Sequence, residues 1–171
     1  MITRLRQGLI ALGLCLILVC VAVVSAQDTG VVLTGVELTR VVPASFYFQG
    51  QSGTTQMRNA AAARFGQKRF VIAGLVDTAG YSADVREKYE GFLITDSPVN
   101  IGGTDLGVGA YGFGFTDDGH LNILDLGGRQ LSSIATAKDA SLRRPRPLMM
   151  MQGKDGIRLY SGREYVVIAA K

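Results

Sequence analysis

The chain has 171 residues with 18 basic and 14 acidic side chains, two cysteines and one histidine. Residues 1–26 hold both cysteines and two of the arginines, which leaves 16 basic residues against 14 acidic in residues 27–171, a net charge of +2. For residues 27–171 this composition excludes a disulfide framework, a cysteine or multi-histidine metal site and the strongly basic character of nucleic-acid-binding domains. We therefore expect no cofactor and no nucleic-acid partner.

The first predicted element is a secretory signal peptide over residues 1–26. Arg4 and Arg6 precede an apolar run from Gly8 to Val24, and the segment closes on Val24-Ser25-Ala26. A charged start, an apolar centre and small residues before the cleavage point are typical of export signals. An uncleaved N-terminal anchor is one alternative and a lipid anchor on Cys20 is another. Cleaved or anchored, the rest of the chain is expected to be exported to the periplasm, the cell surface or the medium.

Residues 27–171 are expected to form a single β domain, since short apolar runs alternate with turn residues along their whole length. Two segments are ambiguous. Residues 57–65 contain four consecutive alanines, which favour helix, but the break at Gly66 favours a hairpin, and we expect a strand. Residues 82–92 fit one short helix, or a loop that leads into a strand over residues 89–95. The remaining strands expected in this half of the domain are 36–42, 45–49 and 70–76.

The second half of the domain contains the clearest hairpin. Between residues 109 and 125, Tyr111, Phe113 and Phe115 alternate with glycine, so that one face of the strand carries three rings. Asp117-Asp118-Gly119 then supplies a turn into a second apolar run. Three further strands are expected after it, and the last is apolar on both faces, as in the interior of a sheet. They cover residues 147–152, 157–160 and 164–169.

About eight to ten short strands, with a turn signal every ~8–12 residues, predict an all-β fold. We expect an antiparallel β-sandwich, which can include one short helix, and a small β-barrel is the alternative. In such a fold the stripe of three rings is expected to be core rather than a platform for stacking sugars.

The histidine, serine and acidic patterns that could support catalysis or metal binding each lack a required part. A histidine-dependent nucleophile has one possible centre, His120, and Gly80-Tyr81-Ser82-Ala83-Asp84 lacks the second glycine of a nucleophile elbow. The Asp117-Asp118-Gly119 turn lacks the spaced acidic ligands and distant glutamate of a calcium loop. We therefore expect no catalytic residue and no metal ligand in this set.

Paired carboxylates offer one enzymatic alternative. Leu75-Val76-Asp77-Thr78-Ala79-Gly80 resembles the aspartic protease signature, and Ile101-Gly102-Gly103 resembles a later apolar-glycine element of that family. The resemblance implies a hydrolase centred on Asp77, in which a homodimer supplies the two carboxylates. Ala79 stands where the family has glycine, and the 24 residues from Asp77 to Ile101 are few for the strands between the two elements.

One basic cluster is the best candidate for a contact surface. Arg143, Arg144 and Arg146 lie within five residues, and Pro145 and Pro147 keep the segment extended. Three guanidinium groups so close together suit an anionic surface, such as lipid headgroups, a polysaccharide or an acidic protein. A merely solvated loop is the alternative.

A second resemblance covers residues 101–115. Ile101-Gly102-Gly103-Thr104-Asp105-Leu106-Gly107-Val108-Gly109-Ala110-Tyr111 resembles the start of a strand in small secreted bacterial β-domains and in carboxypeptidase regulatory-like sandwiches. It implies an accessory sandwich without catalysis, and it carries over no binding residue. The sequence thus predicts an exported non-catalytic β-sandwich that acts in binding or in envelope structure, with an envelope component or another exported protein as its partner. The Asp77-centred hydrolase and a carrier with an apolar cavity are the alternatives.

Overall fold

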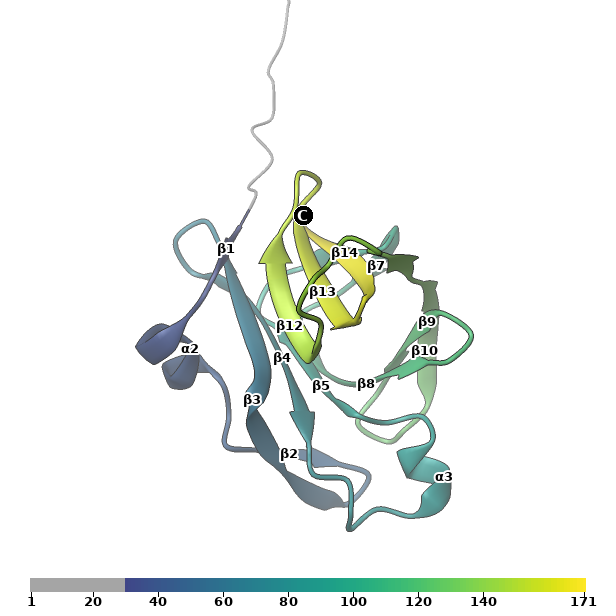
Figure 1. Ribbon diagram of the computed structural model, residues 1–171. Helices are drawn as coiled ribbons and strands as arrows, with labels where there is room; N and C mark the ends of the chain where they lie inside the picture. The colour runs from purple at the N-terminus through teal and green to yellow at the C-terminus, as the bar shows by residue number, and fades with distance from the viewer. Residues whose placement is uncertain (1–29) are drawn as a thin grey trace, which may run out of the picture.

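The computed structural model describes residues 30–171, so the predicted signal peptide lies outside the described residues. Two antiparallel β-sheets pack against each other, with two short helices at the margins (Figure 1). This confirms the all-β sandwich, because the strands form two separate sheets and do not close into the barrel considered as an alternative.

The larger sheet has the strand order β1-β3-β4-β5-β8-β9-β10, and β2 pairs with the first part of β3. Most of its strands are joined by tight turns, as the turn residues predict. Its members are β1 (Val31–Val32), β2 (Ser45–Phe48), β3 (Gln51–Phe65), β4 (Arg69–Val76), β5 (Gly91–Thr95), β8 (Gly109–Thr116), β9 (His120–Leu124) and β10 (Gln130–Ala135).

The smaller sheet has the order β12-β13-β14-β6-β7, and β11 also pairs with β14. Strand β14 has neighbours on both sides, which confirms the interior position predicted from its two apolar faces. The members of this sheet are β6 (Val99–Ile101), β7 (Thr104–Leu106), β11 (Ala137–Lys138), β12 (Arg146–Gln152), β13 (Ile157–Gly162) and β14 (Glu164–Ala170).

The main core fills the space between the two sheets. Alternate residues of each strand point inward, as a period of two requires. Phe113, in the middle of the predicted aromatic stripe, is fully buried there, with Tyr111 and Phe115 half-buried at its margin. The expectation that this stripe is core is therefore confirmed for Phe113, while Phe115 at the margin packs against the core and also lines the cleft described below. Fully buried partners from the two sheets include Val71, Leu93, Ile123, Ile101, Leu159 and Ile168.

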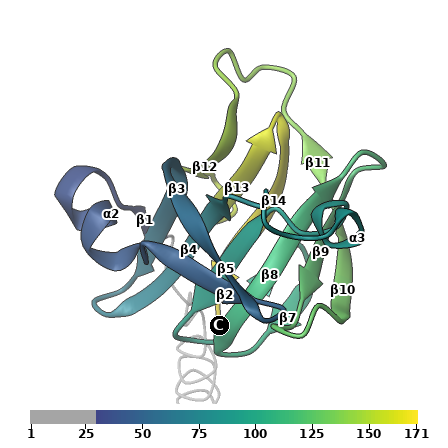
Figure 2. The same ribbon diagram turned by 90° about the horizontal axis from the view of Figure 1, so that it is seen from below.

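A second core covers the other face of the larger sheet. Strand β2 and the segment around α3 (Ala83–Arg86) cross over β5 and β8 (Figure 2). The ring of Phe48 lies on Gly112 of β8, where a Cβ would come within 2.4 Å of the ring. The glycines that alternate with the aromatic stripe therefore make room for this second layer.

One predicted strand is a helix. Residues 36–42 are rich in β-branched side chains and were expected to be extended, but α2 (Gly35–Val41) occupies this position. Gly35 has a φ of +55°, which turns the chain after β1, and Leu38 and Val41 then share a helix face that packs against the second core. Packing of the partly buried Leu38 and Val41 against the second core overrides the local β-propensity.

The two ambiguous segments are settled. Residues 57–65 belong to the long strand β3, as expected, while the 82–92 region contains both proposed elements, the helix α3 followed by strand β5. The three predicted C-terminal strands correspond to β12, β13 and β14, and Asp117-Asp118-Gly119 is the turn between β8 and β9.

Candidate binding cleft

An open cleft of about 400 Å³ lies at one end of the sandwich, between the β8–β9 turn and the β13–β14 turn. Strand β14 begins at this cleft with Glu164 and ends at Ala170, next to Lys171, whose carbonyl oxygen accepts a hydrogen bond from Arg69 at the opposite end. Both sheets contribute to the walls of the cleft. The side chains that matter chemically are Glu90, Phe115, Asp117, Lys138, Arg163 and Glu164.

Glu90 forms part of the wall contributed by the larger sheet. It precedes β5, and its Oε2 accepts a hydrogen bond of 3.0 Å from the backbone N–H of Phe115 on β8. Burial raises the pKa of the Glu90 carboxyl above its usual value, the Phe115 bond opposes this rise, and the nearby charge of Asp117 adds to it. Glu90 is thus a partly desolvated carboxyl that is fixed by the main chain.

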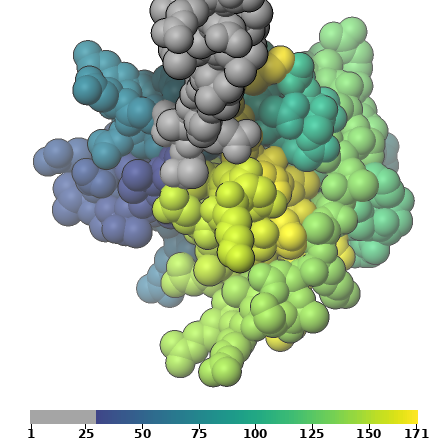
Figure 3. Space-filling model, turned by 90° about the horizontal axis from the view of Figure 1, so that it is seen from above, coloured from purple at the N-terminus to yellow at the C-terminus, as the bar shows by residue number. Residues whose placement is uncertain are grey.

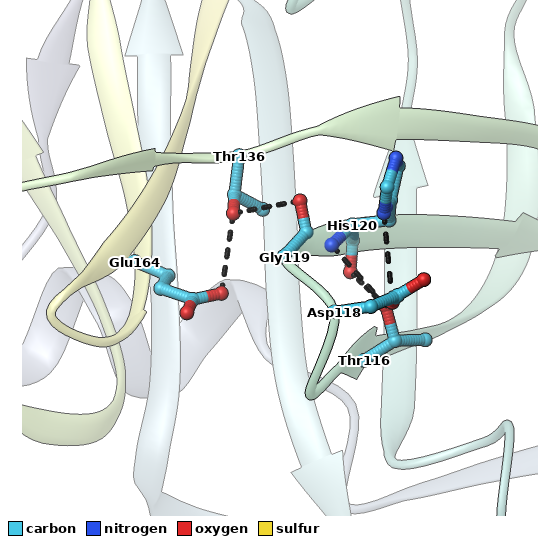
Figure 4. A network of polar contacts seen from close by, with 6 residues as sticks. All are labelled: Thr116, Asp118, Gly119, His120, Thr136 and Glu164. Carbon is cyan, nitrogen blue, oxygen red and sulfur yellow. Dashed lines mark hydrogen bonds and ion pairs between the residues drawn. The ribbon is translucent and has the colours of Figure 1, made fainter.

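Glu164 lies on the wall opposite Glu90, and a polar network holds its carboxylate (Figure 4). The Thr136 hydroxyl lies 3.1 Å from Oε2 of Glu164 and 3.0 Å from the carbonyl oxygen of Gly119. A hydroxyl has one proton, so it donates to one of these acceptors at a time. The backbone N–H of Thr136 also donates to Gly119, at 2.9 Å. These contacts tie the β8–β9 turn of the larger sheet to the first residue of β14.

Lys138 and Arg163 supply the positive charge of the cleft. Lys138 is the cross-strand partner of Glu164, and the backbone N–H of Asp139 donates to the Arg163 carbonyl at 2.9 Å. Both side chains are exposed, and neither makes a hydrogen bond or ion pair with any other residue between 30 and 171. The cleft therefore holds two unpaired cations in addition to its carboxylates.

The predicted basic cluster borders this cleft. Arg143, Arg144 and Arg146 are exposed, and Pro145 between them lines the cleft wall. Figure 3 shows the light green segment between β11 and β12, which carries these arginines, projecting from the body of the domain. That the cluster contacts an anionic surface remains a prediction.

The base of this projecting segment is fixed by Asp139. Oδ1 of Asp139 accepts hydrogen bonds from the hydroxyl and backbone N–H of Ser141, at 2.6 and 3.0 Å. Oδ2 accepts a bond of 3.1 Å from the hydroxyl of Tyr160 on β13. The Ser141 hydroxyl lowers the pKa of the Asp139 carboxyl below its usual value, and the Tyr160 bond adds to this effect. The arginines are therefore presented from an anchored base.

His120 has an acidic neighbour but no nucleophile. Its Nδ1 lies 3.5 Å from Oδ1 of Asp118, and the Thr116 hydroxyl donates to the same oxygen at 2.5 Å (Figure 4). The Thr116 bond lowers the pKa of the Asp118 carboxyl below its usual value. Among the described residues, no serine hydroxyl makes a hydrogen bond with His120. These contacts shape the β8–β9 turn.

The two elements that resemble an aspartic protease lie in different sheets. Asp77 follows β4 in the larger sheet, and its Oδ1 accepts a bond of 3.0 Å from the backbone N–H of Ala79. Residues 101–103 end β6 of the smaller sheet, where the Gly103 N–H donates to Asn100. The structure thus gives Asp77 a turn-forming hydrogen bond. The described residues contain no group of three His, Cys, Asp or Glu side chains placed to hold a metal ion.

Sequence reasoning missed four of the charged residues in the cleft: Glu90, Lys138, Arg163 and Glu164. They come from separate parts of the chain, and no motif spacing links them. One local signal was present, because Glu90 is a charged residue directly between Tyr89 and the apolar strand Gly91–Thr95. A charged residue next to an apolar strand is typical either of the end of that strand or of a functional site.

Comparison with known proteins identifies no relative of this chain. No protein-family model, no curated protein and no solved structure matches it. The resemblances to aspartic proteases and to carboxypeptidase regulatory-like domains therefore stay predictions. The residues of the cleft are the remaining guide to function.

Proposed function

We propose that the protein is an exported, non-catalytic binding domain whose cleft binds an anionic carbohydrate of the cell envelope. The observation that carries this proposal is the pair of unpaired cations, Lys138 and Arg163, in a cleft that also contains fixed carboxylates. The predicted signal peptide supports the envelope as its place of action.

The chemistry of the cleft suits a sugar with a carboxylate or phosphate group. Lys138 and Arg163 can bind the anion through charge-assisted hydrogen bonds, which are the stronger kind. Glu90 and Glu164 can accept hydrogen bonds from sugar hydroxyls, since a carboxylate has more acceptor sites than its bond within the fold uses. The half-buried ring of Phe115 and the ring of Pro145 offer apolar contact for a pyranose face.

The proposal assigns binding rather than catalysis to the two glutamates. Each is already engaged by the fold, Glu90 by the Phe115 N–H and Glu164 by the Thr136 hydroxyl. A carboxylate fixed in this way is preorganised to accept a hydroxyl group with little further loss of entropy.

Calorimetric titration of the purified protein with trigalacturonate, and with the bisphosphate of a glucosamine disaccharide, tests the proposal. Wild type is expected to bind at least one of the two, and a Lys138→Ala/Arg163→Ala variant to bind it at least tenfold more weakly. The control is Lys68→Ala/Lys154→Ala, which removes two exposed lysines at the opposite end and should leave affinity unchanged.

Three results would contradict the proposal. Failure of both anionic sugars to bind, or equal binding of uncharged maltotriose, would remove the anionic specificity. An equal loss in the two double variants would show a general effect of net charge rather than a site. Shortening of trigalacturonate during incubation would show catalysis and overturn the non-catalytic role.

A further inference from the structure

A second hollow lies beside the cleft, at the seam where strand β12 of the smaller sheet approaches strand β3 of the larger sheet. This groove has a volume of about 250 Å³ and runs between β12, β3 and the start of α2. Figure 1 shows β12 beside β3, with α2 on the outer side of β3. Its walls mix apolar and polar groups. The apolar side chains that line it are Leu38, Ala60, Ala61, Leu148, Met149 and Met150, and Thr34 and Arg146 add polar groups.

The groove exists because β3 presents small side chains at this point. Ala60 and Ala61 both line the groove although their side chains belong to opposite faces of β3, and Leu148 and Met150 line it from β12. Methionine adapts its shape to irregular apolar partners, so the wall formed by Met149 and Met150 suits a flexible chain.

Helix α2 forms one edge of this groove. None of its residues is buried, and Thr34 at its N-cap makes no side-chain capping bond. Leu38 is the α2 side chain that reaches into the groove, while Val36 on the same helix is exposed and lies outside it.

The basic segment contributes one residue to the cleft and the next residue to the groove. Pro145 lines the cleft, and the next residue, Arg146, lines the groove. Arg146 also pairs across β12 and β13 with Gly162, which is itself part of the cleft wall. Arg143, Arg144 and Arg146 thus lie between a polar hollow and an apolar one.

We propose that the full ligand is an anionic glycolipid, with its anionic sugar bound by Lys138 and Arg163 in the cleft, further negative charge at the arginine segment and an acyl chain in the groove. This inference rests on the proposed function, because it adds an apolar chain to the anionic sugar assigned there. The positive charge of the arginine segment and the lining of the two hollows by consecutive residues, Pro145 and Arg146, favour this ligand, since a sugar alone leaves the groove unused and a simple lipid leaves the polar cleft unused.

The test compares one sugar in two forms, the glucosamine disaccharide bisphosphate with and without its acyl chains, presented to the full chain in nonionic detergent. The acylated form is expected to bind at least tenfold more tightly than the free sugar. A Leu38→Trp variant, which fills the groove, should abolish this gain while the affinity for the free sugar stays the same. Val36→Trp is the matched control, because it places the same ring on the exposed side of α2, and it should keep the gain.

The outcomes separate the two proposals. If free and acylated sugar bind equally, the glycolipid is wrong and the carbohydrate function stands. If no free anionic sugar binds, the proposed function itself is wrong. If vesicles of phosphatidylglycerol and phosphatidylcholine bind as tightly as the acylated sugar, the surface recognises a membrane, and the glycolipid proposal is overturned. If Leu38→Trp and Val36→Trp reduce the preference for the acylated sugar equally, the groove does not bind the acyl chain, and the glycolipid proposal is wrong.

Discussion

The rings of Phe48 and Tyr89 stack with their centroids 3.8 Å apart and their planes within 8°. Phe48 is on β2 and Tyr89 follows α3, so this pair joins the two segments that cover the outer face of the larger sheet. Tyr81 adds an edge contact to Tyr89 at 5.4 Å. The same α3–β5 connection positions Glu90, the next residue, at the cleft. The second core therefore supports the candidate site as well as the fold.

Replacement of Phe48 by alanine should strongly destabilise the protein. Phe48 is fully buried, so the change opens a cavity over Gly112 and removes the stack on Tyr89. A loss of about 3–5 kcal/mol in the free energy of unfolding is expected. Urea denaturation followed by circular dichroism measures it. Tyr47→Ala is the control, because Tyr47 is 59% exposed on the opposite face of the same strand, and it should cost less than about 1 kcal/mol. Equal effects of the two changes would contradict the second core.

Tyr89→Phe should change the response to alkaline pH. Burial, followed by the nearby hydroxyl of Tyr81, raises the pKa of Tyr89 above its usual value of 10. An acid whose pKa is higher in the folded protein than in the unfolded chain stabilises the fold below pH 10 and loses that contribution as the pH rises above it. Its hydroxyl oxygen is buried and makes no hydrogen bond with a described residue, so Tyr89→Phe should cost little at pH 7.

Thermal unfolding between pH 7 and pH 11 checks this expectation. Wild type should lose stability above pH 10 more steeply than Tyr89→Phe. Tyr47→Phe, which removes an exposed hydroxyl, should follow wild type. Parallel curves for all three proteins would show that Tyr89 does not contribute to alkaline unfolding.

Local signals predicted most of the fold. Asp117-Asp118-Gly119 and the alternation around Phe113 identified the β8–β9 hairpin, because turn type and side-chain period are encoded within a few residues. Helix α2 was missed because Val36 and Thr39 favour strand locally, while packing of the partly buried Leu38 and Val41 against the second core decides the outcome. The bare glycine face of β8 was visible in the sequence, but nothing local indicated that Phe48 covers it.

The cleft could not be predicted in the same way. Lys138 and Glu164 become neighbours only when β11 pairs with β14, and Glu90 joins them from the other sheet. Such a set depends on the order of strands, which short-range patterns do not specify. The arginine cluster was found because its charge is concentrated in one segment, although its position between two hollows was not.

Glu90→Gln should stabilise the protein at neutral pH. Because burial raises the pKa of Glu90, the folded state holds this proton more firmly than the unfolded chain does. The contribution to stability is therefore complete below about pH 4.5 and is lost as the pH rises through the folded pKa. Gln keeps an acceptor for the Phe115 N–H without the cost of a buried charge. Urea midpoints measured from pH 4 to pH 8 should show wild type losing stability relative to Glu90→Gln as the pH rises. A constant difference between the two would contradict this account.

Asp77 should be replaceable by asparagine. Its carboxylate accepts one backbone hydrogen bond from Ala79, which an asparagine carbonyl can also accept. Asp77→Asn should change the free energy of unfolding by less than about 0.5 kcal/mol, and Asp77→Ala should lower it by about 0.5–1.5 kcal/mol. Urea denaturation distinguishes the two. If the protein hydrolyses a peptide library and Asp77→Asn abolishes that activity without loss of stability, the Asp77-centred hydrolase replaces the binding function.

The arginine segment should contribute a salt-dependent part of ligand binding. Arg143, Arg144 and Arg146 are exposed, so their attraction to an anion is screened by ions within about 10 Å at 0.1 M salt. Replacement of all three by alanine is expected to weaken binding of the acylated bisphosphate roughly three- to tenfold at 50 mM salt, and less at 300 mM.

The matched control removes the same charge elsewhere. Arg40→Ala/Arg58→Ala/Lys68→Ala changes three exposed cations outside the cleft and the segment. If binding depends on these particular guanidinium groups, this control keeps wild-type affinity and salt dependence, while the segment variant binds more weakly and depends less on salt. If the two triple variants weaken binding equally, the cluster acts only through net charge, and the solvated-loop interpretation of residues 143–146 is correct.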